Sequence, residues 1–316
     1  MAQATMQPAG FRMAGSSPGE LLKSSETVHF YQDDGFKLEG DLLVKPGTTP
    51  KLAIIFCNGW GGTRNLGTNP ATFATGFADR VDAVTLNFDY SGWGGSEGPR
   101  NRLDPFREAA DVRCAVSYMK QRFPELAGNI VLFGISFGGG IVPVAGGTDP
   151  RVAGVVALSG YASGERFLRD QRAHWQWIEF GERLERDRLQ RVVSGKSELV
   201  DPDEIMVRDP EASAYNQKLL AEFPTRRFKL DLVSAERIRD FDVAGPAAGL
   251  RGRPSVFIHA ERDLLIPWQS NAATAESAGG KFVLLPAIGH YDVYAGKPLV
   301  DVLDHIAGFL VETGLA

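Results

Sequence analysis

The stretch that decides the fold is NIVLFGISFG, residues 129–138, an apolar run that ends in two glycines on either side of a central serine. A short apolar run bounded by glycine is typical of a buried strand, and the small residues after it open a helix. Glycines at both flanks keep a sharp turn free of side chains that would collide with the strand or the helix. The pattern therefore predicts a nucleophile elbow with Ser136 as the candidate nucleophile, although an ordinary glycine-rich turn would give the same five residues.

The length and composition of the chain suit one large α/β domain with an insertion, or two smaller domains. Its 316 residues are 43% hydrophobic, which is enough for a sizeable buried core. A formal net charge of -5 gives no basic excess to neutralise phosphates, so we expect a small-molecule substrate and no nucleic acid. No run approaches the roughly 18 apolar residues that cross a bilayer, so we expect no membrane partner and a cytoplasmic location.

Residues 1–25 have no signal-peptide core and are interpreted as a flexible N-terminal arm. The two cysteines are far apart in the sequence, Cys57 in a predicted strand and Cys114 in a predicted helix. Cysteine and histidine do not cluster at metal-ligand spacing. We therefore expect no metal, no cofactor and no disulfide framework.

Short β-rich runs alternate with helical patterns over much of the chain. The runs 28–31 and 37–44, separated by Asp-Asp-Gly, predict an antiparallel hairpin. A helical pattern covers residues 105–122, and a last amphipathic helix is expected over residues 299–312. Six further runs predict buried parallel strands, at residues 52–57, 83–88, 130–133, 152–158, 255–259 and 281–285. This alternation predicts an α/β fold with a doubly wound, mostly parallel sheet and an N-terminal antiparallel hairpin.

The alternation stops between residues 161 and 245, where the sequence becomes charged and helical. We expect a helical cap, or lid, over residues 161–245, inserted in a core made of residues 26–160 and 246–316. Residues 166–191 carry charges of both signs, as on a solvated helix face. Aromatic residues among these charges are expected to line a substrate pocket or an interface, namely Trp175, Trp177 and Phe180. The cap or the arm would also be the surface of a possible homodimer.

A serine hydroxyl is a weak nucleophile at neutral pH, so Ser136 needs a histidine as base and a carboxylate that orients it. Asp263 follows the predicted strand 255–259, and His290 follows the predicted strand 281–285 beside a glycine. Glu261 is the nearest rival of Asp263. The other four histidines are interpreted as structural, namely His29, His174, His259 and His305.

Acyl transfer also needs amide donors for the oxyanion. The amide of Phe137, directly after the candidate nucleophile, is the first predicted donor. The sequence NGWGG, residues 58–62, follows the predicted strand 52–57, and its glycines allow the backbone to turn amides inward. Trp60 is the predicted second donor, with Gly59 and Gly61 as alternatives. The other interpretation of this stretch is a plain glycine-rich turn with Trp60 packed in the core.

Several of these motifs together resemble the α/β-hydrolase superfamily, over roughly residues 28–314. Residues 58–62 resemble the family's His-Gly-x-Gly-Gly loop, and DYSGWGGSEG, residues 89–98, resembles its Asp-x-Arg-Gly-x-Gly-x-Ser loop. In that family the acid follows the nucleophile and the histidine comes last, which is the order Ser136, Asp263, His290. The hairpin and the ending GHYDVY, residues 289–294, are most similar to dienelactone-hydrolase-like and acyl-peptidase-like serine hydrolases.

Three departures from the family pattern bear on the expected chemistry. Asn58 stands where the family has histidine, and Ser91 where it has arginine; neither belongs to the expected triad. Ser136 stands where true dienelactone hydrolases have cysteine, which favours ordinary ester, thioester or amide cleavage. The resemblance thus implies a serine hydrolase that cleaves an ester or thioester of a small to medium, largely apolar substrate. A peptidase or amidase, a C–C bond hydrolase and an acyltransferase remain alternatives on the same scaffold, with a non-catalytic ligand-binding module beyond them.

Overall fold

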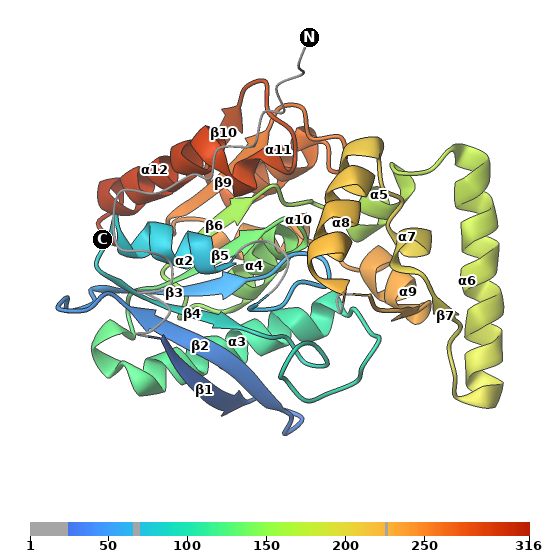
Figure 1. Cartoon of the computed structure of the whole chain (residues 1–316), viewed down its shortest axis with the longest axis horizontal. Coiled ribbons are helices and arrows are strands. Elements are labelled where there is room, and N and C mark those ends of the chain that lie inside the picture. The colour runs from blue at the N-terminus through green and yellow to red at the C-terminus, as the bar shows by residue number, and fades with distance from the viewer. Residues whose placement is uncertain (1–24, 66–69, 225–226) are drawn as a thin grey trace, which may run out of the picture.

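Eight strands form one central sheet in the computed structural model, which describes residues 25–65, 70–224 and 227–316 (Figure 1). The predicted arm, apart from Ser25, lies outside the described residues. The spatial order of the strands is β1-β2-β4-β3-β5-β6-β9-β10. Their bounds are Ser25–Tyr31 for β1, Lys37–Val44 for β2, Leu52–Cys57 for β3, Ala83–Phe88 for β4, Ile130–Ile135 for β5, Gly154–Leu158 for β6, Ser255–Ala260 for β9 and Lys281–Leu285 for β10.

The pairing of the strands confirms the predicted fold class. β1 pairs antiparallel with β2, and β2 pairs antiparallel with β4, whereas β3, β4, β5, β6, β9 and β10 pair in parallel. The turn between β1 and β2 contains Gly35, whose φ of 85° lies in the left-handed region that favours glycine. Small shifts separate the predicted runs from the strands: β5 extends to Ile135, β6 begins at Gly154 and β9 extends to Ala260. The prediction that residues 281–285 form a buried strand is wrong, because β10 is the last strand of the sheet and only Leu285 in it is buried.

Successive side chains of a strand point to opposite faces of the sheet, and inner strands such as β3, β5 and β6 are apolar throughout, so both faces are apolar. Helices cover both faces. In β3, Ala53, Ile55 and Cys57 pack in one apolar cluster, and Leu52, Ile54 and Phe56 pack in another. The first cluster includes residues of α3 (Pro105–Arg122), α4 (Phe137–Thr148), α10 (Ala244–Ala247) and α11 (Trp268–Ala278). The second includes residues of α2 (Pro70–Ala78) and α12 (Gly296–Glu312). The sheet is therefore doubly wound, as the sequence predicts.

Residues 161–245, here called the inserted segment, leave the sheet after β6 and return before β9 (Figure 1). The two ends of the segment are joined by hydrogen bonds at a narrow neck. Gly164 N donates to Phe241 O at 3.0 Å, Val243 N donates to Ala162 O at 3.1 Å, and Ser163 bridges to Asp242. The segment contains α5 (Gly164–Arg169), α6 (His174–Ser194), β7 (Leu199–Val200), α7 (Pro202–Ile205), α8 (Pro210–Glu222), β8 (Leu230–Asp231) and α9 (Val233–Arg239).

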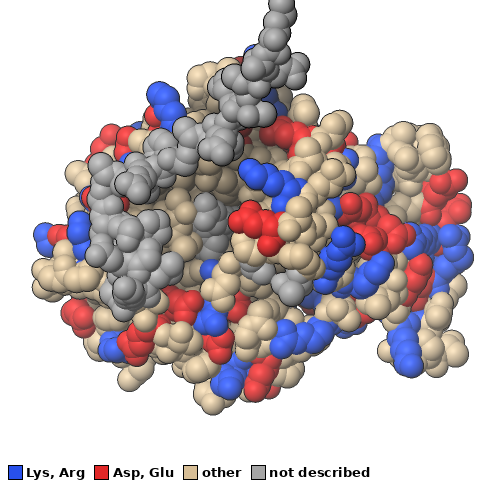
Figure 2. All heavy atoms as spheres, viewed as in Figure 1, with Lys and Arg blue, Asp and Glu red and all other residues tan. Residues whose placement is uncertain are grey.

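The surface of the inserted segment carries interspersed positive and negative side chains, as Figure 2 shows on the face in view. Several of them form i, i+4 pairs on α5 and α6, such as Glu165 with Arg169 and Glu182 with Arg186. Each such exposed pair adds about 0.3–0.5 kcal/mol at most to the stability of the helix. The main effect of these charges is therefore to give the helices a polar surface that water can solvate. None of the helices in the described parts of the chain is long and apolar enough to cross a membrane.

Candidate active site

Ser136 lies at the tip of a sharp turn between β5 and α4, with a φ of 56° and a ψ of -120°. A non-glycine residue with positive φ stores strain of about 1–3 kcal/mol, and such strain is concentrated at functional sites. The neighbouring glycines are required by close backbone approaches. A Cβ at Gly134 would lie 2.2 Å from Gly138 O, and a Cβ at Gly138 would lie 2.2 Å from Cys57 O. The predicted strand, turn and helix therefore exist, and they hold Ser136 at the tip of the turn with a strained backbone.

The structure brings Ser136, His290 and Asp263 together, although His290 lies 154 positions after Ser136 and 27 positions after Asp263 in the chain. His290 Nε2 lies 3.0 Å from Ser136 Oγ, and His290 Nδ1 lies 2.5 Å from Asp263 Oδ2. The three side chains are buried. An ionised Asp263 accepts the Nδ1–H, which leaves Nε2 free to accept the proton of the Ser136 hydroxyl.

The Asp263 carboxylate is held by four donors. Its Oδ1 accepts the amide hydrogens of Leu265 at 2.9 Å and Ile266 at 2.7 Å. Its Oδ2 lies 3.1 Å from His259 Nε2 in addition to the bond from His290. Burial by itself raises the pKa of Asp263, but the charge of His290 and the hydrogen bonds from His259 and His290 outweigh burial and bring that pKa well below its ordinary value. The carboxylate is therefore ionised over the whole physiological range.

His290 is perturbed in the opposite direction. Burial lowers the pKa of its imidazole, but the charge and hydrogen bond of Asp263, followed by the charges of Glu211 and Asp209, raise it above its ordinary value. The rival carboxylate Glu261 does not lie at His290; it accepts the amide hydrogen of Ala287 at 2.8 Å.

The predicted oxyanion residues lie beside Ser136. Phe137 is the first residue of α4, and the indole of Trp60 packs edge-on against its ring, with ring centroids 5.5 Å apart. Trp60 also lines the pocket at Ser136. The loop that carries Trp60 turns at Gly61, whose φ is 56°, and is fixed by Asn58, whose Nδ2 donates to Asn87 Oδ1 and Phe88 O, both at 3.2 Å.

The second departure from the family pattern is also accounted for by hydrogen bonds. Ser91 donates its hydroxyl to Asp111 Oδ1 and its amide to Asp111 Oδ2, both at 2.8 Å. This loop therefore binds a buried carboxylate of α3 through a serine hydroxyl and a backbone amide.

A pocket of about 50 Å³ opens at Ser136 and His290. The inserted segment contributes five of its lining residues, namely Met206, Arg208, Tyr215, Asn216 and Leu219. A larger cavity of about 670 Å³ shares part of this wall, namely Tyr215, Leu219, Tyr291 and Tyr294. The wall between the reacting groups and the larger cavity is thus built by α8 and by the residues that follow His290.

The three aromatic residues singled out in the inserted segment lie elsewhere on α6. Trp175 is 61% exposed, and Trp177 packs against the main apolar cluster. Phe180 is buried beneath Arg172, whose guanidinium carbon lies 4.0 Å from the ring centroid. None of the three is among the described residues that line the pocket at Ser136.

Helix α8 makes contacts with the His290 loop that the sequence patterns did not indicate. The ring of Tyr215 stacks on Tyr291 with centroids 4.2 Å apart, and Glu211 accepts the backbone amide hydrogen of Tyr291. A Cβ at Gly289 would lie 2.6 Å from Glu211 Oε1, so a side chain at this position would displace the Glu211 carboxylate. No sequence pattern indicates this contact, because Tyr215 and Tyr291 are far apart in the chain and meet only through the folding of the inserted segment.

Within the described parts of the chain, no group of three or more histidine, cysteine or acidic side chains is arranged to hold a metal ion. The free thiols of Cys57 and Cys114 are both buried.

Comparisons with known proteins agree with this geometry. A model of the family described as "Alpha/beta hydrolase family" matches residues 54–304. An uncharacterized 31.7 kDa protein of Escherichia coli, from the traX-finO intergenic region, is 27% identical over 256 residues, which are 80% of this chain and 88% of that protein. Thiohydrolase aneE of Aspergillus aculeatus is 28% identical over 140 residues, which are 43% of this chain and 42% of that protein.

Two solved structures share the fold. DcsB in complex with its substrate analogue superposes with a TM-score of 0.78 at 22% identity, covering 92% of this chain and 100% of that one. Est1E of Butyrivibrio proteoclasticus with bound ferulic acid gives a TM-score of 0.62 at 17% identity, again covering 92% and 100%. Because the family model spans most of the sequence and the strand order matches the fold, this chain belongs to the alpha/beta hydrolase family.

Proposed function

We propose that this chain is a serine hydrolase that cleaves an ester or thioester of a small to medium, largely apolar substrate. The observation that carries the proposal is the continuous hydrogen-bonded series from Ser136 Oγ through His290 to Asp263, at 3.0 and 2.5 Å. A serine on a strained turn, an imidazole and a buried ionised carboxylate are the groups that nucleophilic acyl transfer requires.

The proposed reaction has two halves. His290 Nε2 takes the proton of Ser136 as its oxygen attacks the acyl carbonyl, and Asp263 stabilises the imidazolium that forms. The imidazolium then protonates the leaving alcohol or thiol, which leaves the acyl group on Ser136. A water molecule, deprotonated by His290, hydrolyses this acyl-enzyme. The amides of Phe137 and Trp60 are the proposed donors to the oxyanion in both halves.

We further propose that the inserted segment is a cap that sets substrate preference. The pocket wall that it supplies contains apolar and aromatic side chains of Met206, Tyr215 and Leu219, with polar groups from Arg208 and Asn216. We therefore propose substrate contacts on α8 and the residues before it, in place of Trp175, Trp177 and Phe180 of α6. Tyr215→Ala should broaden the accepted chain length, while Trp177→Ala should leave it unchanged.

The names of two similar proteins support an ester or a thioester as the bond that is cleaved. One relative is called a thiohydrolase, and archaeal structures with the same fold, such as that from Pyrococcus furiosus, are called esterases. The hairpin of β1 and β2 and the sequence of residues 289–294 support a place in the dienelactone-hydrolase-like or acyl-peptidase-like branch.

Ser136→Ala is the direct test. Turnover of aryl esters and thioesters of graded acyl length should fall by at least about a thousandfold, because the nucleophile is lost while the fold is kept. A fluorophosphonate probe should label the native chain at Ser136 and leave the variant unlabelled. Undiminished hydrolysis by the variant would overturn the proposal, and labelling without hydrolysis of any ester or thioester would redirect it to amide or C–C cleavage or to acyl transfer.

A further inference from the structure

Helix α6 lies at the edge of the molecule, with one side against the rest of the inserted segment and the other side open to solvent (Figure 1). Its outer side carries large apolar residues that a solvated helix does not need. The exposed fractions are 61% for Trp175, 50% for Ile178, 60% for Leu189, 79% for Val192 and 89% for Val193. These residues occur in two groups, one near each end of the helix.

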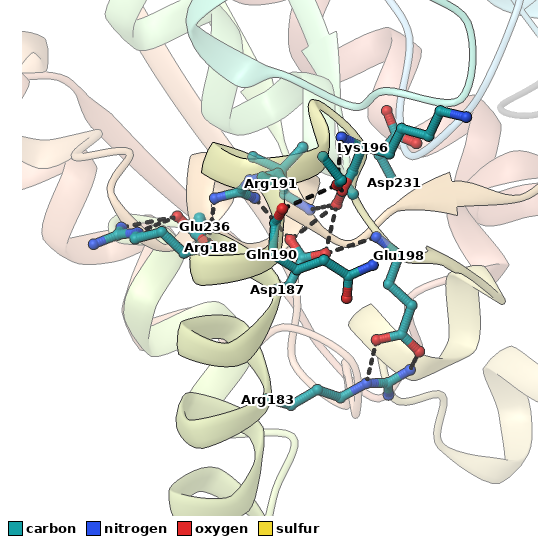
Figure 3. A network of polar contacts seen from close by, with 12 residues as sticks. Arg183, Asp187, Arg188, Gln190, Arg191, Lys196, Glu198, Asp231 and Glu236 are labelled. Atoms are coloured by element: carbon teal, nitrogen blue, oxygen red, sulfur yellow. Dashed lines mark hydrogen bonds and ion pairs between the residues drawn. The ribbon is translucent and has the colours of Figure 1, made fainter.

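The inner side of α6 is tied down by a polar network, drawn in Figure 3. Asp187 accepts hydrogen bonds from Arg191 at 2.8 Å and from the backbone amide of Glu198 at 2.6 Å. Arg191 and Arg188 both donate to Glu236 of α9, at 2.8 Å each. These bonds hold α6 in one orientation, so the apolar side chains on its outer side face solvent in a fixed arrangement.

The outer side is a single stripe. At about 100° per residue, Trp175, Ile178, Glu182, Arg186, Leu189 and Val193 fall within an arc of roughly 80°. The buried residues Phe180, Leu184 and Asp187 lie on the opposite side of the helix. From one end to the other, the stripe is therefore apolar, charged and apolar again.

The stripe on one α6 helix is complementary to the same stripe on a second α6 helix that runs in the opposite direction. In an antiparallel pair of α6 helices related by a two-fold axis at the level of Leu184, Trp175 meets Val193, Ile178 meets Leu189, and Glu182 meets Arg186. Glu182 and Arg186 pair with each other along the helix at 3.9 Å, and they are 66% and 68% exposed, so each charge is also accessible to a partner of opposite sign. A parallel pair would instead place Glu182 against Glu182 and Arg186 against Arg186, which like-charge repulsion disfavours.

We propose that the outer side of α6 is the interface of a homodimer in which two copies of this chain pair these helices antiparallel across a two-fold axis. The apolar ends supply the buried area, and the two central Glu182–Arg186 pairs set the direction and the register. A contact made mainly by one helix from each copy is smaller than the roughly 800 Å² per partner of a standard interface. The dimer should therefore dissociate on dilution.

Sedimentation equilibrium from micromolar to sub-millimolar concentration tests the assembly. The native chain should move from a 34.3 kDa species to one of twice that mass as concentration rises. Val193→Asp should shift this transition to at least tenfold higher concentration, because a carboxylate then faces Trp175 of the partner. Val311→Asp is the matched control, since Val311 is also exposed, at 62%, but lies on α12. A native chain that stays monomeric, or a control that dissociates equally, would overturn the proposal.

Disulfide trapping tests the antiparallel geometry. Residues 175 and 193 of one helix are about 27 Å apart, so cysteines placed there cannot join within one chain. The double variant Trp175→Cys/Val193→Cys should form a covalent dimer under mild oxidation, whereas Val193→Cys alone should not. The native thiols will not interfere, because burial raises the pKa of both Cys57 and Cys114. Efficient trapping of the single variant would show a parallel contact and contradict the proposed register.

Discussion

At the residue scale, the backbone of Ser136 departs most clearly from what its residue type prefers. Its φ of 56° is uncommon for serine and ordinary for glycine. Ser136→Gly and Ser136→Ala should both be inactive, but the glycine variant should be more stable by about 1 kcal/mol, because only glycine releases the strain. Urea unfolding of the two variants measures this difference. Equal stabilities would show that the turn is not strained.

His259 was interpreted from the sequence as a structural residue, yet it contacts the carboxylate that orients His290. Its Nε2 lies 3.1 Å from Asp263 Oδ2 and 2.9 Å from Ile266 O. In His259→Phe, Asp263 keeps its two amide donors but loses one side-chain donor, so kcat/KM should fall about ten- to a hundredfold. His305→Phe on α12 is the control and should have little effect. If His259→Phe kept the native value of kcat/KM, His259 would have only a packing role and would not help to orient Asp263.

At the element scale, acidic residues at the start of α8 in the inserted segment change the pKa of His290 in the core. Asp263, Glu211 and Asp209 all raise the pKa of His290, so its base form appears at higher pH than in an isolated imidazole. Glu211→Gln removes one of these charges. The acidic limb of the kcat/KM profile should therefore move to lower pH, with little loss at the plateau.

Glu222→Gln is the matched control for this shift, because it removes the same charge from the far end of α8. Its pH profile should coincide with that of the native chain. If Glu211→Gln left the acidic limb in place and lowered the plateau, Glu211 would act only by holding the His290 loop.

The strands and the candidate triad could be predicted from the sequence because both depend on local patterns. Buried parallel strands such as β9 are mostly apolar runs, and the partly exposed edge strand β10 is apolar after Lys281. Asp263 follows β9, and His290 follows β10, at one edge of the sheet. The contact between Glu211 and the His290 loop had no such pattern, because it depends on how the inserted segment folds back over the sheet. Trp175 and Phe180 illustrate the same limit: five positions apart on a helix, they point to opposite sides, and composition does not show which side meets the core.

At the scale of the whole molecule, the buried acidic residues of α3 make the stability depend on pH. Burial, followed by the charges of Asp111 and Asp104, raises the pKa of Glu108 well above its ordinary value. A raised folded pKa means that its stabilising contribution is complete below the unfolded pKa and is lost as pH rises towards the folded pKa. Stability should therefore decline as the pH rises above the ordinary pKa range of a glutamate.

Glu108→Gln should remove much of that decline, because the amide stays neutral at every pH. Glu125→Gln, an exposed change just after α3, should keep the native slope. Guanidinium unfolding at several pH values compares the three chains. A Glu108→Gln variant with the native slope would place the origin of the decline in other groups.

The neck at Ser163 and Asp242 has a consequence for how members of this family diverge. Strands β6 and β9, which flank the inserted segment, are neighbours in the sheet, so the segment departs and rejoins at almost the same point. A graft of another length, joined at these two positions, leaves the register of the strands unchanged and replaces the contacts that α8 makes with the His290 loop. With the proposed role of the segment as a cap, an exchange at the neck would change substrate preference in a single step while the sheet is kept.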